Sequence, residues 1–316
     1  MFVRFMVLVL AILLLWSCEE VVDLDVDFDP QVVVVSEITP RRGAAVTLSR
    51  GRSILSEAET EFVLADEVTL TNQSTGLETE LFLQEIVKDT LNPNRERFPF
   101  YFSDEPQLIS GASTYALNIK VDGEDPISAV TTIPKQVAIQ SLNLVDFSAN
   151  PDPRSERIFD IDFDLTFFHD VETADNYHIA FYFTYLVPRP TETDSVIFFV
   201  VQIPTVENIE TRAVFTKDFE NGILIQGGGL DDGILGLKGN LSVTFEEEFS
   251  PFPPELWVEL RNTNSDYNNY HFNLARQQSQ RDSIIAQAIL IPSNINNGLG
   301  IFSGYNFDQK VLKLIN

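Results

Sequence analysis

Apolar and polar residues alternate over most of this chain, in short runs that are separated by turn residues. The clearest run is Ile158–Phe168. A period of two is the pattern of a β-strand with one buried face and one wet face. Helical periodicity is almost absent before residue 262, so we expect a chain that is mostly β. One face of the run carries Ile161, Phe163, Leu165 and Phe167, and the other carries Asp160, Asp162, Asp164 and Thr166.

The strand-like runs form two groups. Six or seven short runs with turns between them predict an immunoglobulin-like β-sandwich over residues 31–134. Ile133-Pro134-Lys135 marks a boundary, and we expect a second β-sandwich domain over residues 135–316. The runs of the first group are Val32–Ile38, Ala45–Ser49, Glu67–Thr71, Glu78–Gln84, Phe98–Phe102 and Ser113–Val121.

A single helix is predicted near the C-terminus, over about residues 265–281. Ser265 is placed to cap it, and Asp266 suits its positive N-terminal end. Four residues fall at i, i+3, i+4 and i+7 and so share one face, which we expect to pack on the second sandwich. These residues are Tyr267, Tyr270, His271 and Leu274.

The first 17 residues have the pattern of a leader peptide. Arg4 precedes the apolar stretch Phe5–Trp16, which is shorter than the roughly 20 residues that span a bilayer. Leu15–Cys18 then matches a bacterial lipobox. We expect residues 1–17 to be a lipoprotein signal peptide that is cleaved between Ser17 and Cys18, and Cys18 to carry acyl chains such as palmitate. An uncleaved anchor and an ordinary secretory signal are the alternatives.

Cys18 is the only cysteine of the chain, which excludes an internal disulfide and any CxxC site. The segment 18–30 that begins with it contains six acidic residues and no basic one. Its acids alternate with apolar residues, so the segment is either a solvated tether or an edge strand. A calcium-binding carboxylate cluster is a third interpretation.

The net charge of −26 makes nucleic acid an unfavourable partner, because both surfaces would be anionic. Candidate chemistry is sparse. The histidines His169, His178 and His271 have no diagnostic metal-ligand spacing, and no G-x-S-x-G elbow is present. We therefore expect no metal, no cofactor and no catalytic residues, and we interpret the protein as a binding protein and not an enzyme.

The segment Ile291–Tyr305 is the most specific motif after the lipobox, and it resembles the closing motif of a Bacteroidota lipoprotein family catalogued as domain of unknown function 4249. The acidic segment, the Val32–Val35 run, the Val46–Ser49 strand and the Tyr267–Gln278 helix are also similar to that family. The matching positions of the closing motif are Ser293, Asn294, Ile295, Asn297, Gly298, Gly300, Ile301, Phe302 and Gly304.

The resemblance implies an outer-membrane, lipid-anchored and surface-exposed protein that is often encoded beside a TonB-dependent receptor, and it implies no established activity. It also makes the acidic segment similar to a surface-export signal. Three Asp-Ser/Thr-aliphatic triplets match the short O-glycosylation pattern of the same bacteria. The acceptors would be Thr90, Ser195 and Ser283.

Our functional prediction is a non-catalytic binding or accessory subunit of a TonB-dependent β-barrel transporter or of another outer-membrane complex. The alternative is a stand-alone surface adhesin or ligand-binding module. The glycines and asparagines of the closing motif either form a structural turn or make a loop that contacts the partner or ligand. The residues of this candidate loop are Asn294, Asn297, Gly298, Gly300, Phe302 and Tyr305.

Overall fold

The computed structural model describes thirteen stretches of the chain. They are residues 30–52, 60–87, 97–103, 109–151, 157–170, 176–190, 195–202, 205–210, 215–219, 222–227, 230–245, 254–280 and 289–314. The predictions for the signal peptide, for Ser17 and Cys18, for the acidic segment up to residue 29, and for Thr90 and Ser283 lie outside these residues. Ser195 is the first residue of a strand whose backbone is described.

The first sandwich contains two facing sheets. The strands β1, β2, β6 and β5 lie side by side in one sheet, and β18, β8, β7, β3 and β4 form the other. Their bounds are β1 (Val32–Thr39), β2 (Gly43–Arg50), β3 (Glu67–Asn72), β4 (Glu78–Glu80), β5 (Phe82–Val87), β6 (Arg97–Ser103), β7 (Ser113–Lys120), β8 (Ile127–Ile133) and β18 (Ile295–Asn296).

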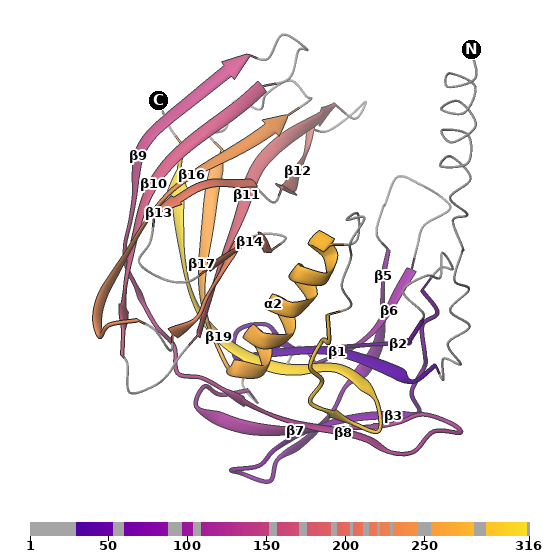
Figure 1. Cartoon of the computed structure of the whole chain (residues 1–316). Helices are drawn as coiled ribbons and strands as arrows, with labels where there is room; N and C mark the ends of the chain where they lie inside the picture. Colours follow the sequence, from indigo (N-terminus) through magenta and orange to yellow (C-terminus); the bar gives the residue numbers. More distant parts are fainter. Residues whose placement is uncertain are drawn as a thin grey trace, which may run out of the picture. The chain divides into compact units, whose positions relative to one another are not determined.

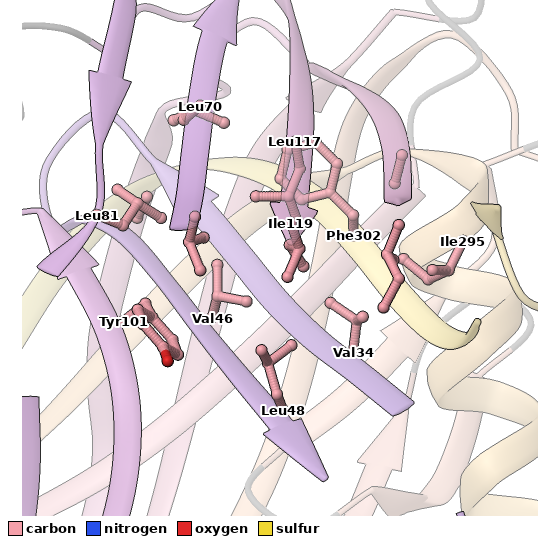
Figure 2. Packing of buried hydrophobic residues seen from close by; sticks show 14 of the residues in the cluster. Val34, Val46, Leu48, Leu70, Leu81, Tyr101, Leu117, Ile119, Ile295 and Phe302 are labelled. Atoms are coloured by element: carbon pink, nitrogen blue, oxygen red, sulfur yellow. The ribbon is translucent and has the colours of Figure 1, made fainter. Parts of the chain in front are cut away.

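Apolar side chains from the two sheets point toward one another and form the first core (Figure 2). Val34, Val46 and Leu48 come from β1 and β2, and Leu117 and Ile119 come from β7. All five are at most 1% exposed. Two facing sheets whose strands alternate between buried and exposed positions are the layout of an immunoglobulin-like sandwich.

The second sandwich repeats this principle with longer strands. The sheet β13-β16-β10-β9 faces the strands β14, β15, β11, β17 and β19, with β12 paired to β11. The bounds are β9 (Ile139–Pro151), β10 (Arg157–His169), β11 (Asn176–Pro190), β12 (Ser195–Gln202), β13 (Thr205–Glu210), β14 (Phe215–Phe219), β15 (Gly222–Ile225), β16 (Gly233–Phe245), β17 (Glu255–Thr263) and β19 (Leu299–Lys313).

The run that gives the clearest alternation in the sequence is β10, and the structure confirms its two faces. Phe163 and Leu165 are at most 1% exposed in the second core, whereas Asp162 and Asp164 are only partly buried on the outer face. Phe163 packs on Phe181 of β11 with ring centroids 5.4 Å apart. The burial of such rings is the main stabilising contribution of this core.

The last strand, β19, belongs to both sandwiches. Its first part pairs in parallel with β1, from Val33↔Leu299 to Ile38↔Gly304. Its second part pairs antiparallel with β17, from Thr263↔Tyr305 to Glu255↔Lys313. The strand can be followed in yellow in Figure 1, beside β1 and then beside β17. It therefore joins the two groups of strands into one sheet.

The helix α2 (Ser265–Gln280) lies where the sequence predicts it. Its cap differs from our expectation, because Asn264 and not Ser265 accepts the hydrogen bond from Tyr267 N, at 2.9 Å. The helix begins at Ser265, so the capping position is the preceding residue. Tyr267 and Tyr270 are buried as expected, and Leu274 is only partly buried. Among the described residues, no helix has the length and apolar content to cross a membrane.

The predicted fold class is confirmed: the chain is mostly β, with two sandwiches and one helix near the C-terminus. Where the domains divide stays a prediction. The two cores separate between Ile133 and Ile139, yet Ile295 and Phe302 from the C-terminal part of the chain lie in the first core.

Candidate functional site

The closing motif predicted from the sequence lies at the start of β19, where the backbone runs close to β1. Gly300 has a φ of +108°, and a Cβ at this position would lie 2.0 Å from Val34 O. A Cβ at Gly298 would lie 2.9 Å from Val32 O. Side chains at these two positions would therefore push the strands apart, and glycine at position 300 also permits the positive φ.

Two asparagines of the motif fasten it to its surroundings. Asn294 Oδ1 accepts a hydrogen bond from Phe302 N at 2.9 Å, and Asn294 Nδ2 donates to Phe302 O at 2.8 Å. Asn297, with a φ of +57°, donates from Nδ2 to Pro126 O at 2.8 Å. Both side chains thus take part in the internal hydrogen bonding of the first sandwich.

The two aromatic residues of the motif point to different sides. Phe302 is 0% exposed in the first core, and Tyr305 is 3% exposed on the face that α2 covers. The exposed part of the motif includes Asn297 and Leu299, and Leu299 is 40% exposed. The turn interpretation agrees with these contacts, and a partner contact through the exposed part stays a prediction.

The structure also contains a site that our sequence reasoning missed. Nine titratable side chains meet between α2 and the strands beneath it, and we call them the buried polar cluster. Its members come from the β1–β2 hairpin, β11, β17, α2 and β19. They are Glu37, Arg42, His178, Tyr182, Glu259, Arg261, Tyr267, His271 and Tyr305.

Glu259 lies at the centre of the cluster's ion pairs. Its side chain is 0% exposed, and its Oε2 lies 2.9 Å from Arg42 Nη2. Its Oε1 lies 3.6 Å from Arg261 Nη2. Arg42 retains 47% of its exposure, so water screens one end of this network and not the other. A buried carboxylate between two guanidinium groups is compensated in charge, and the loss of either partner would leave a buried charge behind.

Arg261 is the main hydrogen-bond donor. It donates to Tyr182 OH and, at 3.3 Å, to Tyr267 OH. Its guanidinium carbon lies 4.8 Å from the ring centroid of Tyr305. Burial alone would lower the pKa of Arg261, but the surrounding tyrosines and Glu259 outweigh burial and keep that pKa well above its usual value. Arg261 is therefore a permanent cation.

The tyrosine side chains of the cluster and His271 are kept neutral. Tyr267 OH lies 2.8 Å from His178 Nδ1. Burial raises the pKa of Tyr267 well above its usual value, and it raises the pKa of Tyr305 to about 12. Burial, assisted by the positive charge of Arg261, lowers the pKa of His271 to about 4. At neutral pH the cluster thus holds the Arg261 cation beside neutral tyrosine side chains and a neutral His271.

Glu37 is the member of the cluster on β1 that lies next to His271 of the helix. Its Oε1 lies 3.7 Å from His271 Nε2. Burial raises the pKa of Glu37, whereas Arg261 and Arg42 oppose that change. Since 35% of the side chain remains exposed, water moderates both influences. The arrangement fits a structural joint between the hairpin, the sheet and the helix better than an acid–base pair aimed at a substrate.

His169 and His178, the pair that sequence reasoning considered for a metal site, are not brought together. His169 Nδ1 lies 2.8 Å from Tyr177 OH, and His178 contacts Tyr267. Tyr177 packs in the second core, whereas Tyr267 belongs to the α2 face, so the two histidines serve different faces of β11. Within the described stretches, no group of three or more His, Cys, Asp or Glu residues is placed to hold a metal ion.

The aspartates of β10 form the wet face that the sequence predicts. Asp160 accepts a hydrogen bond from Ser242 Oγ at 2.9 Å, and Asp162 accepts one from Asn240 Nδ2 at 2.6 Å. An open concavity of about 500 Å³ lies over this face, lined in part by Asp162, Asp164, Lys238 and Asn240. This is a polar surface with room for a ligand, and one of its carboxylates, Asp162, is already hydrogen-bonded to Asn240 of β16.

Sequence reasoning missed the buried polar cluster because of the alternation in β17. Glu259 and Arg261 alternate with Val258 and Leu260, which is the pattern of a strand with a wet outer face. The helix carried the signal that could have revealed the cluster. Tyr267 and His271 bring polar groups to its buried face, and buried polar groups need polar partners.

The comparisons with known proteins give one family. A model described as "Domain of unknown function (DUF4249)" matches residues 19–311. No curated protein matches the sequence. The chain also resembles several adhesin structures at low scores. A chain of a chaperone–tip adhesin complex of CFA/I fimbriae is 12% identical with a TM-score of 0.21, covering 74% of this chain and 84% of that one.

Two further structures give similar values. CfaE, the adhesive subunit of CFA/I fimbria of enterotoxigenic Escherichia coli, is 12% identical with a TM-score of 0.19, covering 88% of this chain and 86% of that one. The collagen adhesin from S. aureus is 10% identical with a TM-score of 0.15, covering 89% and 95%. Similarities at these TM-scores carry no argument about function.

Proposed function

Because the chain belongs to the family described as domain of unknown function 4249, we propose that it is a lipid-anchored outer-membrane protein that binds a partner without catalysing a reaction. The partner we propose is a TonB-dependent β-barrel receptor or another outer-membrane complex, with the protein displayed at the cell surface. The family match begins one residue after Cys18, which fits a mature chain that starts at this cysteine.

The observation that carries the non-catalytic part of the proposal is the use of the reactive side chains. His169, His178 and His271 contact tyrosine or glutamate side chains inside the fold. Glu259 and Arg261 are tied to each other and to the β1–β2 hairpin. Groups held in this way stabilise a scaffold, whereas a catalytic group must reach a substrate.

The exposed part of the closing motif is the contact that we propose for the partner. Leu299 is 40% exposed at the start of β19, and Val311 is 39% exposed near its end. The two residues are apolar, lie on the same strand and are almost equally exposed, so one can be the test position and the other its control. We expect Leu299→Arg to abolish co-purification of the receptor from native membranes in mild detergent, because a cation would be buried in the interface.

Val311→Arg is the control, and it should leave co-purification intact. Both variants should melt like the unaltered protein. Retention of the receptor by Leu299→Arg, or equal loss in both variants, would remove the loop as the contact. If the unaltered protein, at endogenous levels, is purified from native membranes without a bound receptor, the accessory role itself fails.

One observation favours the alternative function of a ligand-binding module. The concavity of about 500 Å³ over β10 and β16 presents carboxylate, amide and ammonium groups to solvent. Such groups suit a small polar ligand. Replacement of Lys238 and Asn240 by alanine should then abolish surface attachment of cells while the receptor complex, if there is one, persists.

A further inference from the structure

The feature with the widest consequence is the pairing between the first strand and the last. Among the described residues, which begin at Pro30, β1 is the first strand, so a load applied to an anchored N-terminus reaches β1 at its start, Val32. β1 and β19 run parallel over six residue pairs, beginning with Val33↔Leu299. The start of β1, where the load enters, therefore lies beside the start of β19. The far end of β19 lies in the second sandwich.

We propose that this parallel ladder is a shear clamp that carries mechanical load between the anchored N-terminus and the second sandwich. A pull on the start of β1 that is resisted at the end of β19 acts along both strands in opposite directions. All six pairs are then loaded together, whereas a pull at one end would open them one after another. The direction of load rests on the proposed anchorage at Cys18, but the resistance of the ladder does not.

The closing motif reinforces the ladder where the load enters. Gly298 and Gly300 allow the backbones to approach, since a Cβ at either position would strike a carbonyl oxygen of β1. Asn294 holds both backbone groups of Phe302 from the side, and the Phe302 ring is fully buried in the first core. Slippage of β19 along β1 would therefore break side-chain hydrogen bonds and withdraw a ring from the core.

Two further links pass the load onward. β19 continues without interruption into nine residue pairs with β17, so covalent backbone carries force into the second sandwich. At the other end of β1, Arg42 in the hairpin turn bridges to buried Glu259 of β17 at 2.9 Å. The ladder and this ion pair are therefore two separate connections between the first sandwich and the second.

Single-molecule pulling on the full mature chain without acylation tests the proposal, because Cys18 then supplies the thiol for one handle and a single added cysteine supplies the other. In the first geometry the second handle is attached at Lys313→Cys, the exposed last residue of β19. In the second it is attached at Asn296→Cys, an exposed residue beside the entry end of the ladder. We expect a rupture force several-fold higher in the first geometry.

Equal rupture forces in the two geometries would overturn the shear clamp, as would separation of β19 from β17 before β1 is released. If Asn296→Cys does not fold, Leu290→Cys replaces it, since Leu290 is 89% exposed. Asn294→Ala should lower the force of the first geometry, whereas Asn240→Ala, which removes a hydrogen bond to Asp162 in the second sandwich, should not. These outcomes do not depend on a membrane or a receptor, so failure of the proposed function would leave them unchanged.

Discussion

Glu259 is the residue whose surroundings depart most from ordinary strand patterning. It is 0% exposed, and its charge is compensated by Arg42 and Arg261. Glu259→Gln removes that charge and leaves two guanidinium groups facing each other across a neutral amide. Because loss of one partner of a buried ion pair costs about 3–5 kcal/mol, we expect the free energy of unfolding to fall by about that much.

Chemical denaturation measures the change, and Glu255→Gln is the control. Glu255 lies on the same strand but is only partly buried, so its replacement should cost less than about 0.5 kcal/mol. A similar small cost for Glu259→Gln would show that the ion pairs contribute little to stability.

His271 gives the buried polar cluster a dependence on pH. Its folded-state pKa of about 4 lies below the usual 6.5, so between these values the unfolded chain binds a proton that the folded chain does not. Stability should therefore fall as pH drops from about 6.5 to about 4, by about 3 kcal/mol. The raised pKa of Glu37 acts in the opposite direction, because its folded form takes up a proton first.

Denaturation midpoints across this pH range should show a flatter profile for His271→Gln and a steeper one for Glu37→Gln. An unchanged slope in His271→Gln would assign the acid sensitivity to other groups.

At the scale of single elements, the helix shows what the sequence can and cannot determine. Periodicity located α2, because Tyr267 and Tyr270 repeat at the spacing of a buried helical face. The cap was placed one residue too late, since Ser265 and Asn264 are both good capping residues and only the backbone geometry distinguishes them.

Asn264→Ala should therefore destabilise the protein by about 1–2 kcal/mol. Its side chain also donates from Nδ2 to Thr131 Oγ1 at 2.7 Å, so the variant loses a contact with β8 as well as the cap. Ser265→Ala at the exposed next position should change the melting temperature very little. The reverse order of effects would restore Ser265 as the cap.

The strands divide in the same way between predictable and unpredictable features. The alternation in β10 shows which residues are buried, because side-chain direction follows the period of the strand. The alternation does not show which strands pair with one another, so the parallel pairing of β1 with β19 was not predicted. Glu259 and Arg261 were hidden for a related reason: a polar face covered by a polar helix has the same pattern as a face covered by water.

At the scale of the whole molecule, the lipid anchor that we propose at Cys18 is open to a direct test. Cys18→Ala should abolish labelling by radioactive palmitate and release the protein from membranes, because the thiol is the acceptor that we propose for the acyl chains. Fractionation of cells that express the variant measures the release. Undiminished labelling would show that Cys18 is not the acceptor, and membrane retention without labelling would be the result expected of an uncleaved leader.

The shared strand β19 also has a consequence for biogenesis. Val33 of β1 pairs with Leu299, which is synthesised 299 − 33 = 266 residues later. The first sandwich therefore lacks its parallel strand, and the ring of Phe302 in its core, until almost the entire chain has emerged. Contacts between such distant residues make folding slow. A chain that is truncated before residue 299 would expose β1 as an open edge, so the first sandwich is complete only once the C-terminal strand is in place.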